Sequence, residues 1–95
     1  MSGNLREQNI QTKILKYLNE CGYYTVKVVS ATKAGVPDIL TCVSGKFVAF
    51  EVKANATKKP TELQNYNLTA IKNSGGYAYV VYNLEQVKDI ICLLQ

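Results

Sequence analysis

The sequence predicts an α/β fold in which a mixed β-sheet is flanked by helices, with the elements in the order α-β-β-β-α-β-α. Apolar residues recur at helical spacing near both ends of the chain. Between these two stretches lie short segments rich in β-branched and aromatic residues, separated by glycines and other small residues. Helices interspersed with strands in this way pack over the faces of a sheet. A chain of 95 residues is the size of one domain, so we expect a single domain over 1–95.

The first helix is predicted from four residues at helical spacing, which are Ile10, Ile14, Leu18 and Cys21. Asn4 and Glu7 have the spacing of a capping box, and Gly22 is suited to end the helix. Strands are predicted next at Tyr23–Ser30, Asp38–Val43 and Lys46–Lys53.

The second half of the chain is predicted to contain two helices and one strand. A helix over Thr61–Ser74 ends at Gly75-Gly76, and a strand follows over Tyr77–Tyr82. Asn83 is a suitable N-cap for the last helix. That helix is predicted from its apolar stripe, formed by Leu84, Val87, Ile91 and Leu94.

Composition excludes several kinds of catalysis. The chain has no histidine, which rules out a Ser-His-Asp triad, a Cys-His pair, histidine-based metal sites and a two-histidine ribonuclease mechanism. Catalysis would have to use carboxylates, lysine, tyrosine, cysteine, hydroxyl groups or a bound metal. Eleven Lys and Arg residues against seven Asp and Glu give a net charge of +4, which suits a polyanionic partner.

The three cysteines predict a reducing environment. Cys21, Cys42 and Cys92 are odd in number and far apart, and each lies among apolar residues. We therefore expect reduced core thiols, without a zinc knuckle or a disulfide framework. No apolar run approaches the length of a membrane span, and Met1–Glu7 lacks the core of a signal peptide. These features predict an intracellular protein without a membrane partner.

A hairpin in the middle of the chain is the strongest candidate for chemistry. If Ser44-Gly45 is a two-residue turn, the numbers of paired residues sum to 89, which places Asp38 opposite Glu51. The two carboxylates would then lie about 5 Å apart at their Cβ atoms. Their repulsion would cost about 3 kcal/mol at an effective dielectric constant of about 20. Such a pair needs a shared proton, a cationic side chain or a divalent metal.

Lys53 lies two residues after Glu51 and therefore projects from the same face. Asp, Glu and Lys on one patch suit Mg²⁺ or Mn²⁺ with a positive group beside it. The alternative is a salt-bridged strand surface, in which Glu51 pairs with Lys53 and Asp38 caps a turn after Pro37.

Residues outside the hairpin have two interpretations each. Glu7 either belongs to the capping box or is a third carboxylate brought to the hairpin, and both can hold together. Gln64 is either partly exposed or faces the core, where its amide needs partners. Lys58 and Lys59 precede a helix and are either solvated or form a corner for phosphate, while Lys33 lies in the other loop beside the hairpin.

Two short segments resemble the PD-(D/E)XK nuclease signature. Gly35-Val36-Pro37-Asp38 is followed by Glu51-Val52-Lys53, with Glu51 thirteen positions after Asp38. The remaining features are similar to the VRR-NUC branch, the virus-type replication-repair nucleases, in the same order along the chain. The resemblance implies a restriction-endonuclease-like fold and covers nearly the whole sequence.

The resemblance also implies roles for individual residues. Asp38, Glu51 and the Val52 main-chain carbonyl would be metal ligands, and Glu7 an outer or second-metal ligand. Lys53 would orient water or stabilise charge on the phosphorus centre, and Gln64 would hold the site or the scissile phosphate. Lys33, Lys58 and Lys59 are the candidate DNA contacts on the rim.

The implied protein is an Mg²⁺- or Mn²⁺-dependent endodeoxyribonuclease without an organic cofactor. Stand-alone members of this branch are implied to be homodimers acting on branched DNA, such as four-way (Holliday) junctions, in the cytoplasm of a bacterial or phage-infected cell. A nicking or flap nuclease with the same site, or a non-catalytic nucleic-acid-binding domain, are the alternatives. A sequence with no recognition helix and one arginine favours contact with the DNA backbone over base readout.

Overall fold

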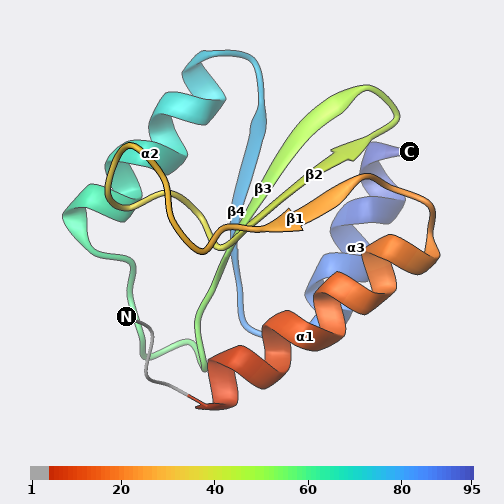
Figure 1. The fold of residues 1–95 in the computed structure, drawn as a ribbon, viewed down its shortest axis with the longest axis horizontal. Coiled ribbons are helices and arrows are strands. Elements are labelled where there is room, and N and C mark those ends of the chain that lie inside the picture. The colour runs from red at the N-terminus through yellow and green to blue at the C-terminus, as the bar shows by residue number, and fades with distance from the viewer. Residues whose placement is uncertain (1–4) are drawn as a thin grey trace.

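The fold is a four-stranded mixed sheet between helices, seen here in a computed structural model that describes residues 5–95 (Figure 1). The strands are ordered β1-β2-β3-β4; the first three are antiparallel and β4 runs parallel to β3. In chain order the elements are α1 (Leu5–Glu20), β1 (Thr25–Lys27), β2 (Ile39–Val43), β3 (Lys46–Val52), α2 (Glu62–Asn73), β4 (Tyr77–Val81) and α3 (Leu84–Leu94). The predicted fold class and element order are confirmed.

Helices cover the two faces of the sheet unequally. Figure 1 shows α2 on one side of the strands and both α1 and α3 on the other. The main core lies on the α1/α3 side, where Ile39 and Phe50 of the sheet pack with Ile14 of α1 and Ile91 of α3. A smaller cluster of buried residues on the α2 side consists of Ala49, Leu68 and Ala78. Side chains alternate between faces along a strand, so Glu51 lies on the α2 side with Ala49.

The turn of the β2–β3 hairpin has the predicted length. Ser44 and Gly45 both have positive φ, at 52° and 80°, as a two-residue type I′ turn requires. The pairing runs from Val43 opposite Lys46 to Ile39 opposite Phe50, which is the predicted register. Extended by one residue, this register brings Asp38 to Glu51.

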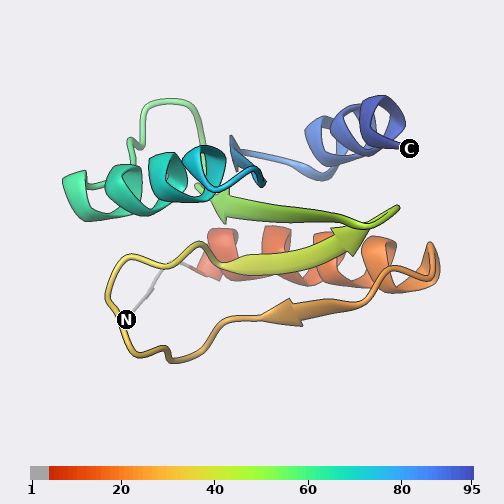
Figure 2. The ribbon, with the colours of Figure 1, turned by 90° about the horizontal axis from the view of Figure 1, so that it is seen from above.

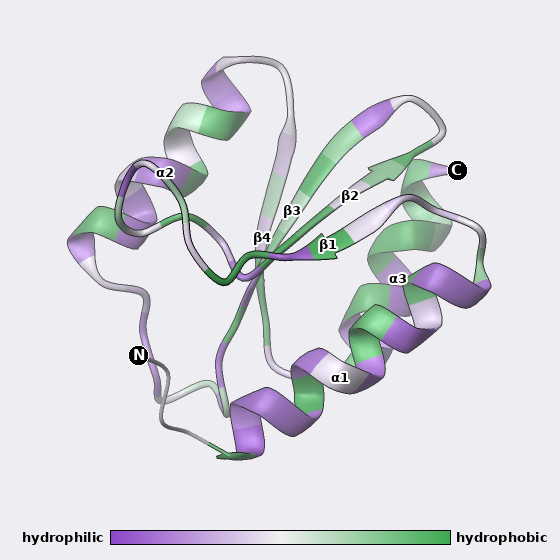
Figure 3. Ribbon diagram, viewed as in Figure 1, coloured by the Kyte–Doolittle hydropathy of each residue, from purple (hydrophilic) through white to green (hydrophobic). Residues whose placement is uncertain are grey.

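Helix ends follow the sequence signals closely. The Thr61 side chain accepts a hydrogen bond from the Gln64 N–H, and the Gln64 side chain accepts one from the Thr61 N–H, so α2 opens with a complete capping box. Asn83 is the N-cap of α3, as predicted. The α1 capping box expected from Asn4 lies outside the described residues. Figure 3 shows that α1 begins with a strongly hydrophilic stretch, whereas α3 is largely hydrophobic.

The first strand is shorter than predicted. Only Thr25–Lys27 pairs regularly with β2, whereas the pattern of β-branched residues predicted a strand over Tyr23–Ser30. This strand lies at the edge of the sheet, and its exposed neighbours Tyr24 and Val29 bury little apolar surface that would extend it. The chain leaves the sheet after Val28 and forms a long loop before β2 (Figure 2).

The prediction of core cysteines is wrong. Cys21, Cys42 and Cys92 are all free thiols, as expected, but all three are exposed. Cys42 lies on the α2 side of β2, in a part of the sheet that α2 leaves uncovered. Cys21 follows the end of α1, and Cys92 lies on α3 between Ile91 and the exposed Leu93. Apolar neighbours in the sequence therefore did not predict burial of these three cysteines correctly.

Within residues 5–95, no helix has both the length and the apolar character that crossing a membrane requires.

Candidate active site

The hairpin brings Asp38 and Glu51 together where β2 begins and β3 ends. Asp38 is half-buried, and its Oδ2 accepts a hydrogen bond of 2.7 Å from the Val52 N–H. This bond ties the carboxylate that precedes β2 to the backbone of the neighbouring strand. The carboxyl groups of Asp38 and Glu51 interact directly, so each changes the pKa of the other. The predicted proximity of these two side chains is confirmed.

Glu51 is an acid buried inside the protein. Its side chain is 2% exposed, and its Oε1 is buried without a hydrogen-bond partner. The other oxygen, Oε2, lies 3.5 Å from Lys53 Nζ. A buried carboxyl oxygen without a partner loses its hydration and gains nothing in return, so the fold carries a cost at this position.

Burial dominates the electrostatics of the two carboxyl groups. Loss of hydration, followed by the charge of Asp38, raises the pKa of Glu51 to about 8, although Lys53 opposes the shift. Loss of hydration also raises the pKa of Asp38, while the Val52 N–H and Lys53 pull it down. With a pKa of about 8, Glu51 favours its protonated form at neutral pH, because the buried site stabilises the neutral carboxyl group over the carboxylate.

Lys53 links the carboxylates to α2. Its Nζ, in a side chain 13% exposed, donates a hydrogen bond of 3.0 Å to Gln64 Oε1. The same Gln64 oxygen accepts from the Thr61 N–H at 2.9 Å. Both interpretations of Gln64 are therefore partly met, because it serves the helix cap and also contacts the site. The predicted alternative to a metal site, a salt-bridged strand surface, is met only in part. Lys53 Nζ does contact Glu51, but Glu51 is buried, and Asp38 accepts its hydrogen bond from the Val52 N–H across the hairpin.

Glu7 reaches the end of β3 from the first turns of α1. Its Oε2 accepts a hydrogen bond of 3.1 Å from the Ala54 N–H, and its charge contributes to the raised pKa of Asp38. The N-terminal part of α1 therefore lies against the site, as the interpretation of Glu7 as a third carboxylate expected.

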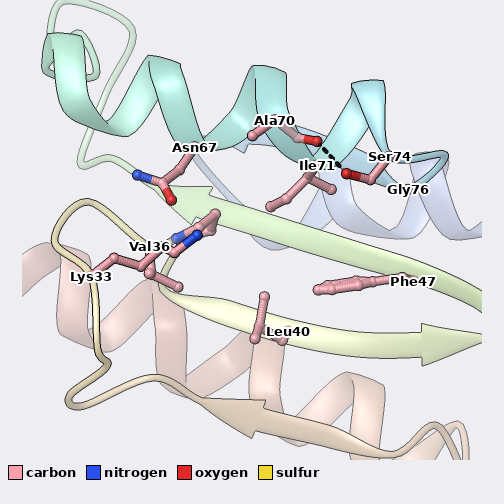
Figure 4. Close-up of a pocket in the computed structure, with 10 residues that line it drawn as sticks. Lys33, Val36, Leu40, Phe47, Asn67, Ala70, Ile71, Ser74 and Gly76 are labelled. Atoms are coloured by element: carbon pink, nitrogen blue, oxygen red, sulfur yellow. Dashed lines mark hydrogen bonds between the residues drawn. The ribbon is translucent and has the colours of Figure 1, made fainter.

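The three rim lysines, Lys33, Lys58 and Lys59, are exposed. Lys33 also lines an apolar groove of about 350 Å³ between the hairpin and α2. Figure 4 shows Val36 and Leu40 on one side of this groove and Asn67 and Ile71 of α2 on the other. The Asn67 amide holds the loop against α2 by donating to the Ala34 and Leu63 carbonyls, at 3.0 and 2.9 Å.

Sequence analysis missed one polar residue near the site. Gln11 is 3% exposed, its Oε1 is buried without a hydrogen-bond partner, and it lines a cavity that Asp38 also lines. The available signal was its position four residues after Glu7, which places both side chains on one face of α1.

The donor set suits a hard cation. Within residues 5–95, no three His, Cys, Asp or Glu side chains are already grouped as a metal site. The Asp38–Glu51 pair nevertheless offers carboxylate oxygens, one of them buried and unpartnered, which are the ligands that Mg²⁺ and Mn²⁺ prefer. The residues present therefore fit the implied metal.

Two solved structures share this architecture. One, named as a VRR_NUC domain, superposes with a TM-score of 0.80 over 93% of this chain and 96% of its own, at 24% identity. The other, named as a VRR_NUC domain protein, gives a TM-score of 0.78 over 95% of this chain and 88% of its own, at 18% identity. No protein-family model matches the sequence, and no curated protein is significantly similar to it. The chain has the VRR-NUC fold.

Proposed function

We propose that this protein is a metal-dependent, structure-selective DNA endonuclease that hydrolyses phosphodiester bonds. The observation that supports this most directly is the buried Glu51 oxygen without a partner, beside Asp38 and Lys53. The carboxyl pair destabilises the folded protein, and binding a cation beside the phosphate would explain why the site contains it. The VRR-NUC fold supports the same assignment.

Each residue of the site has a role in this proposal. Asp38, Glu51 and the Val52 carbonyl would hold Mg²⁺ or Mn²⁺, with Glu7 as an outer or second-metal ligand. When bound, the cation would lower the pKa of the attacking water and neutralise charge on the phosphate oxygens. The Val52 N–H fixes the Asp38 carboxylate in place for this task.

Lys53 supplies a positive charge beside the reacting phosphate. Its contacts with Glu51 and Gln64 keep the ammonium at the site and not in solvent. From there it would orient the attacking water or stabilise the charge that builds up on the phosphorus centre. Gln64 positions Lys53, and because it also caps α2, the Lys53 ammonium is tied to the first turn of this helix.

DNA contact is proposed to be electrostatic and shape-selective. Lys33, Lys58 and Lys59 are exposed in the loops that flank the hairpin, where they can reach phosphates on either side of the site. This favours recognition of DNA shape over recognition of sequence.

The proposed substrate is a four-way junction, cut by a homodimer. The domain measures 29 × 29 × 23 Å, so one copy spans about eight base pairs at about 3.4 Å each, which is less than one turn of duplex. Two copies related by a two-fold axis would present two sites to the two-fold symmetry of a junction.

A cleavage assay tests the proposed activity. Wild-type protein and Asp38→Asn would be incubated with labelled four-way junction, flap and linear duplex, each in Mg²⁺, Mn²⁺ or EDTA. We expect wild-type cleavage of the junction with either metal and none in EDTA. Asp38→Asn keeps an acceptor for the Val52 N–H but loses a charge, so it should bind junction as well or better and not cut.

Other outcomes identify the alternatives. Equal cutting of flaps or duplex would indicate a nicking or flap nuclease. DNA binding without cleavage under any condition would indicate a non-catalytic binding domain. Normal cleavage by Asp38→Asn would refute the assigned site.

A further inference from the structure

Two buried side-chain oxygens lack a hydrogen-bond partner within residues 5–95; one belongs to a carboxyl group that interacts with Asp38, and the other to a side chain that shares a cavity with Asp38. One is Glu51 Oε1, whose carboxyl group interacts with Asp38 across the hairpin. The other is Gln11 Oε1, whose side chain lines the same cavity as Asp38. Buried polar atoms are nearly always paired in folded proteins, so these two unpaired acceptors indicate a missing donor.

Gln11 lies on α1 with Glu7, away from the hairpin that carries Asp38 and Glu51. It lies one turn after Glu7 on α1, at the α1 side of a cavity of about 420 Å³. The opposite wall of this cavity is the loop between β1 and β2, and Asp38 lies where that loop enters β2. Gln11 therefore shares with Asp38 a cavity that α1 closes on one side, whereas Glu51 interacts with Asp38 across the hairpin.

The side chains that line this cavity do not supply the donor. Lys27 and Lys33 both line it and could each donate, yet both are exposed and neither bonds to Gln11. A neutral amide oxygen also adds no charge to an already acidic pair. The Gln11 amide oxygen can instead accept a hydrogen bond from a small donor held near Asp38.

Coordinated water is a donor of this kind. Mg²⁺ keeps several waters when proteins bind it through one or two carboxylates. Such a water has its lone pair directed at the cation and its hydrogens directed outward, so it needs acceptors around it. Partners that lie outside the ligand set often decide how tightly a metal is held and how its waters are oriented.

We propose that Gln11 is a positioning residue of this site, whose carbonyl oxygen accepts a hydrogen bond from a cation-bound water on the α1 side of Asp38. The inference rests on the proposed function, because it needs a divalent cation at Asp38 and Glu51. It adds a residue that orders the water of the site without touching the metal.

Two substitutions at Gln11 separate this role from a packing role. Gln11→Met keeps the length of the side chain and removes the acceptor, whereas Gln11→Glu keeps the acceptor. Gln8→Met makes the same change at an exposed position on the same helix and is the matched control. Three quantities are measured: Kd for Mg²⁺ and Mn²⁺ by calorimetry without DNA, Tm in EDTA, and kcat and KM for junction cleavage.

Loss of the Gln11 acceptor should stabilise the cation-free protein but impair cation binding and cleavage. Gln11→Met should raise Tm in EDTA, because it removes a buried acceptor without a partner. It should weaken cation binding about 10-fold and lower kcat with little change in KM. Gln11→Glu should bind the cation at least as tightly as wild type while lowering Tm in EDTA. Gln8→Met should match wild type in cation Kd and in kcat.

Two results would overturn the inference. One is a Gln11→Met protein with wild-type cation Kd and kcat. The other is loss of Tm, cation binding and cleavage together in both Gln11 variants, which would make the residue structural. A wild-type protein that binds no divalent cation would contradict the proposed function itself, so the two failures are distinguishable.

Discussion

Glu51 makes the stability of this protein depend on pH. A glutamate titrates near 4.5 when it is unperturbed, and burial raises the pKa of Glu51 to about 8 in the folded protein. Between these values the folded state keeps a proton that the unfolded state releases. The stabilisation that this proton provides is complete below the unfolded pKa and is lost as the pH rises through the folded pKa.

We therefore predict that the free energy of unfolding, measured in EDTA, falls steadily from pH 5 to pH 8. Glu51→Gln should flatten most of this slope, because the amide is neutral throughout, and should be more stable than wild type at pH 8. Urea unfolding followed by circular dichroism at four pH values measures both effects. Glu20→Gln, a change at an exposed glutamate, is the control and should keep the wild-type slope. An unchanged slope in Glu51→Gln would show that another group is responsible.

The contacts of individual side chains were predictable only within one element or one hairpin. The Asp38–Glu51 pair follows from the length of a turn and the alternation of side chains. The contact of Glu7 with Ala54 and the burial of Gln11 depend on where α1 packs against the end of β3. Spacing along one helix does not contain that information, so Gln11 was missed.

At the scale of elements, α2 depends on a cap that also serves the site. Gln64 Oε1 accepts from both the Thr61 N–H and Lys53 Nζ. The Thr61 hydroxyl accepts from the Gln64 N–H at 3.1 Å, which fixes the first turn of the helix. Gln64 Oε1 therefore serves both the helix cap and the Lys53 ammonium, whereas the Thr61 hydroxyl serves the helix alone.

Thr61→Ala should separate these two roles. It removes the hydroxyl acceptor and should lower the free energy of unfolding by about 1 kcal/mol. Because Gln64 still accepts from Lys53, kcat should stay within a few-fold of wild type. Thr61→Ser, which keeps the hydroxyl, should restore stability in the same urea titration. A large loss of kcat in Thr61→Ala would mean that the cap holds Lys53 directly in place.

The basic loop before α2 provides a prediction about DNA. Replacing Lys58 and Lys59 with Ala should weaken binding to junction, flap and duplex alike, and reduce the log-log salt slope by up to about 2. Fluorescence anisotropy from low to moderate salt measures the slope. Lys72→Ala, at the opposite end of α2, should leave the slope near that of wild type. An unchanged slope in the double variant would place the DNA path elsewhere.

Elements were predicted well where local caps and turns fix their ends, and poorly at the edge strand β1. The ends of α2 and α3 and the hairpin register follow from caps and turn residues whose chemistry is local. The short β1 lies at the sheet edge beside exposed residues, and Cys42 is exposed on β2; both depend on tertiary packing, which local sequence does not contain. Sequence propensity alone overestimated the length of β1 and the burial of Cys42.

At the scale of the whole molecule, apolar side chains of β4 and α3 already pack within the domain and are not left free for an interface. β4 is an edge strand, but Tyr79 stacks on Phe50 with ring centroids 5.9 Å apart. The α3 residues Val87, Ile91 and Leu94 are buried in the main core. The proposed dimer must therefore form mainly through other surfaces.

We predict that light scattering at micromolar concentration gives twice the mass of the chain. A plasmid that extrudes a cruciform tests the paired sites directly: paired cuts linearise it, and a single cut leaves a nicked circle. Excess Asp38→Asn mixed with wild type should shift the product from linear to nicked, because mixed dimers hold one working site. A monomeric mass, or a product ratio that the mixture does not change, would contradict the dimer.

The β2–β3 hairpin fixes which face of the sheet each residue of β3 occupies. Five consecutive pairs separate the Ser44-Gly45 turn from the acidic pair, a distance of about 20 Å at about 3.3 Å per residue. An extra residue in the turn can be accommodated by a longer loop. An extra residue inside β3 would put Glu51 out of phase, moving it from the α2 side into the apolar core beneath α1 and α3. The position of Glu51 beside Asp38 therefore depends on the number of residues in β3, and not only on the identity of the two carboxyl residues.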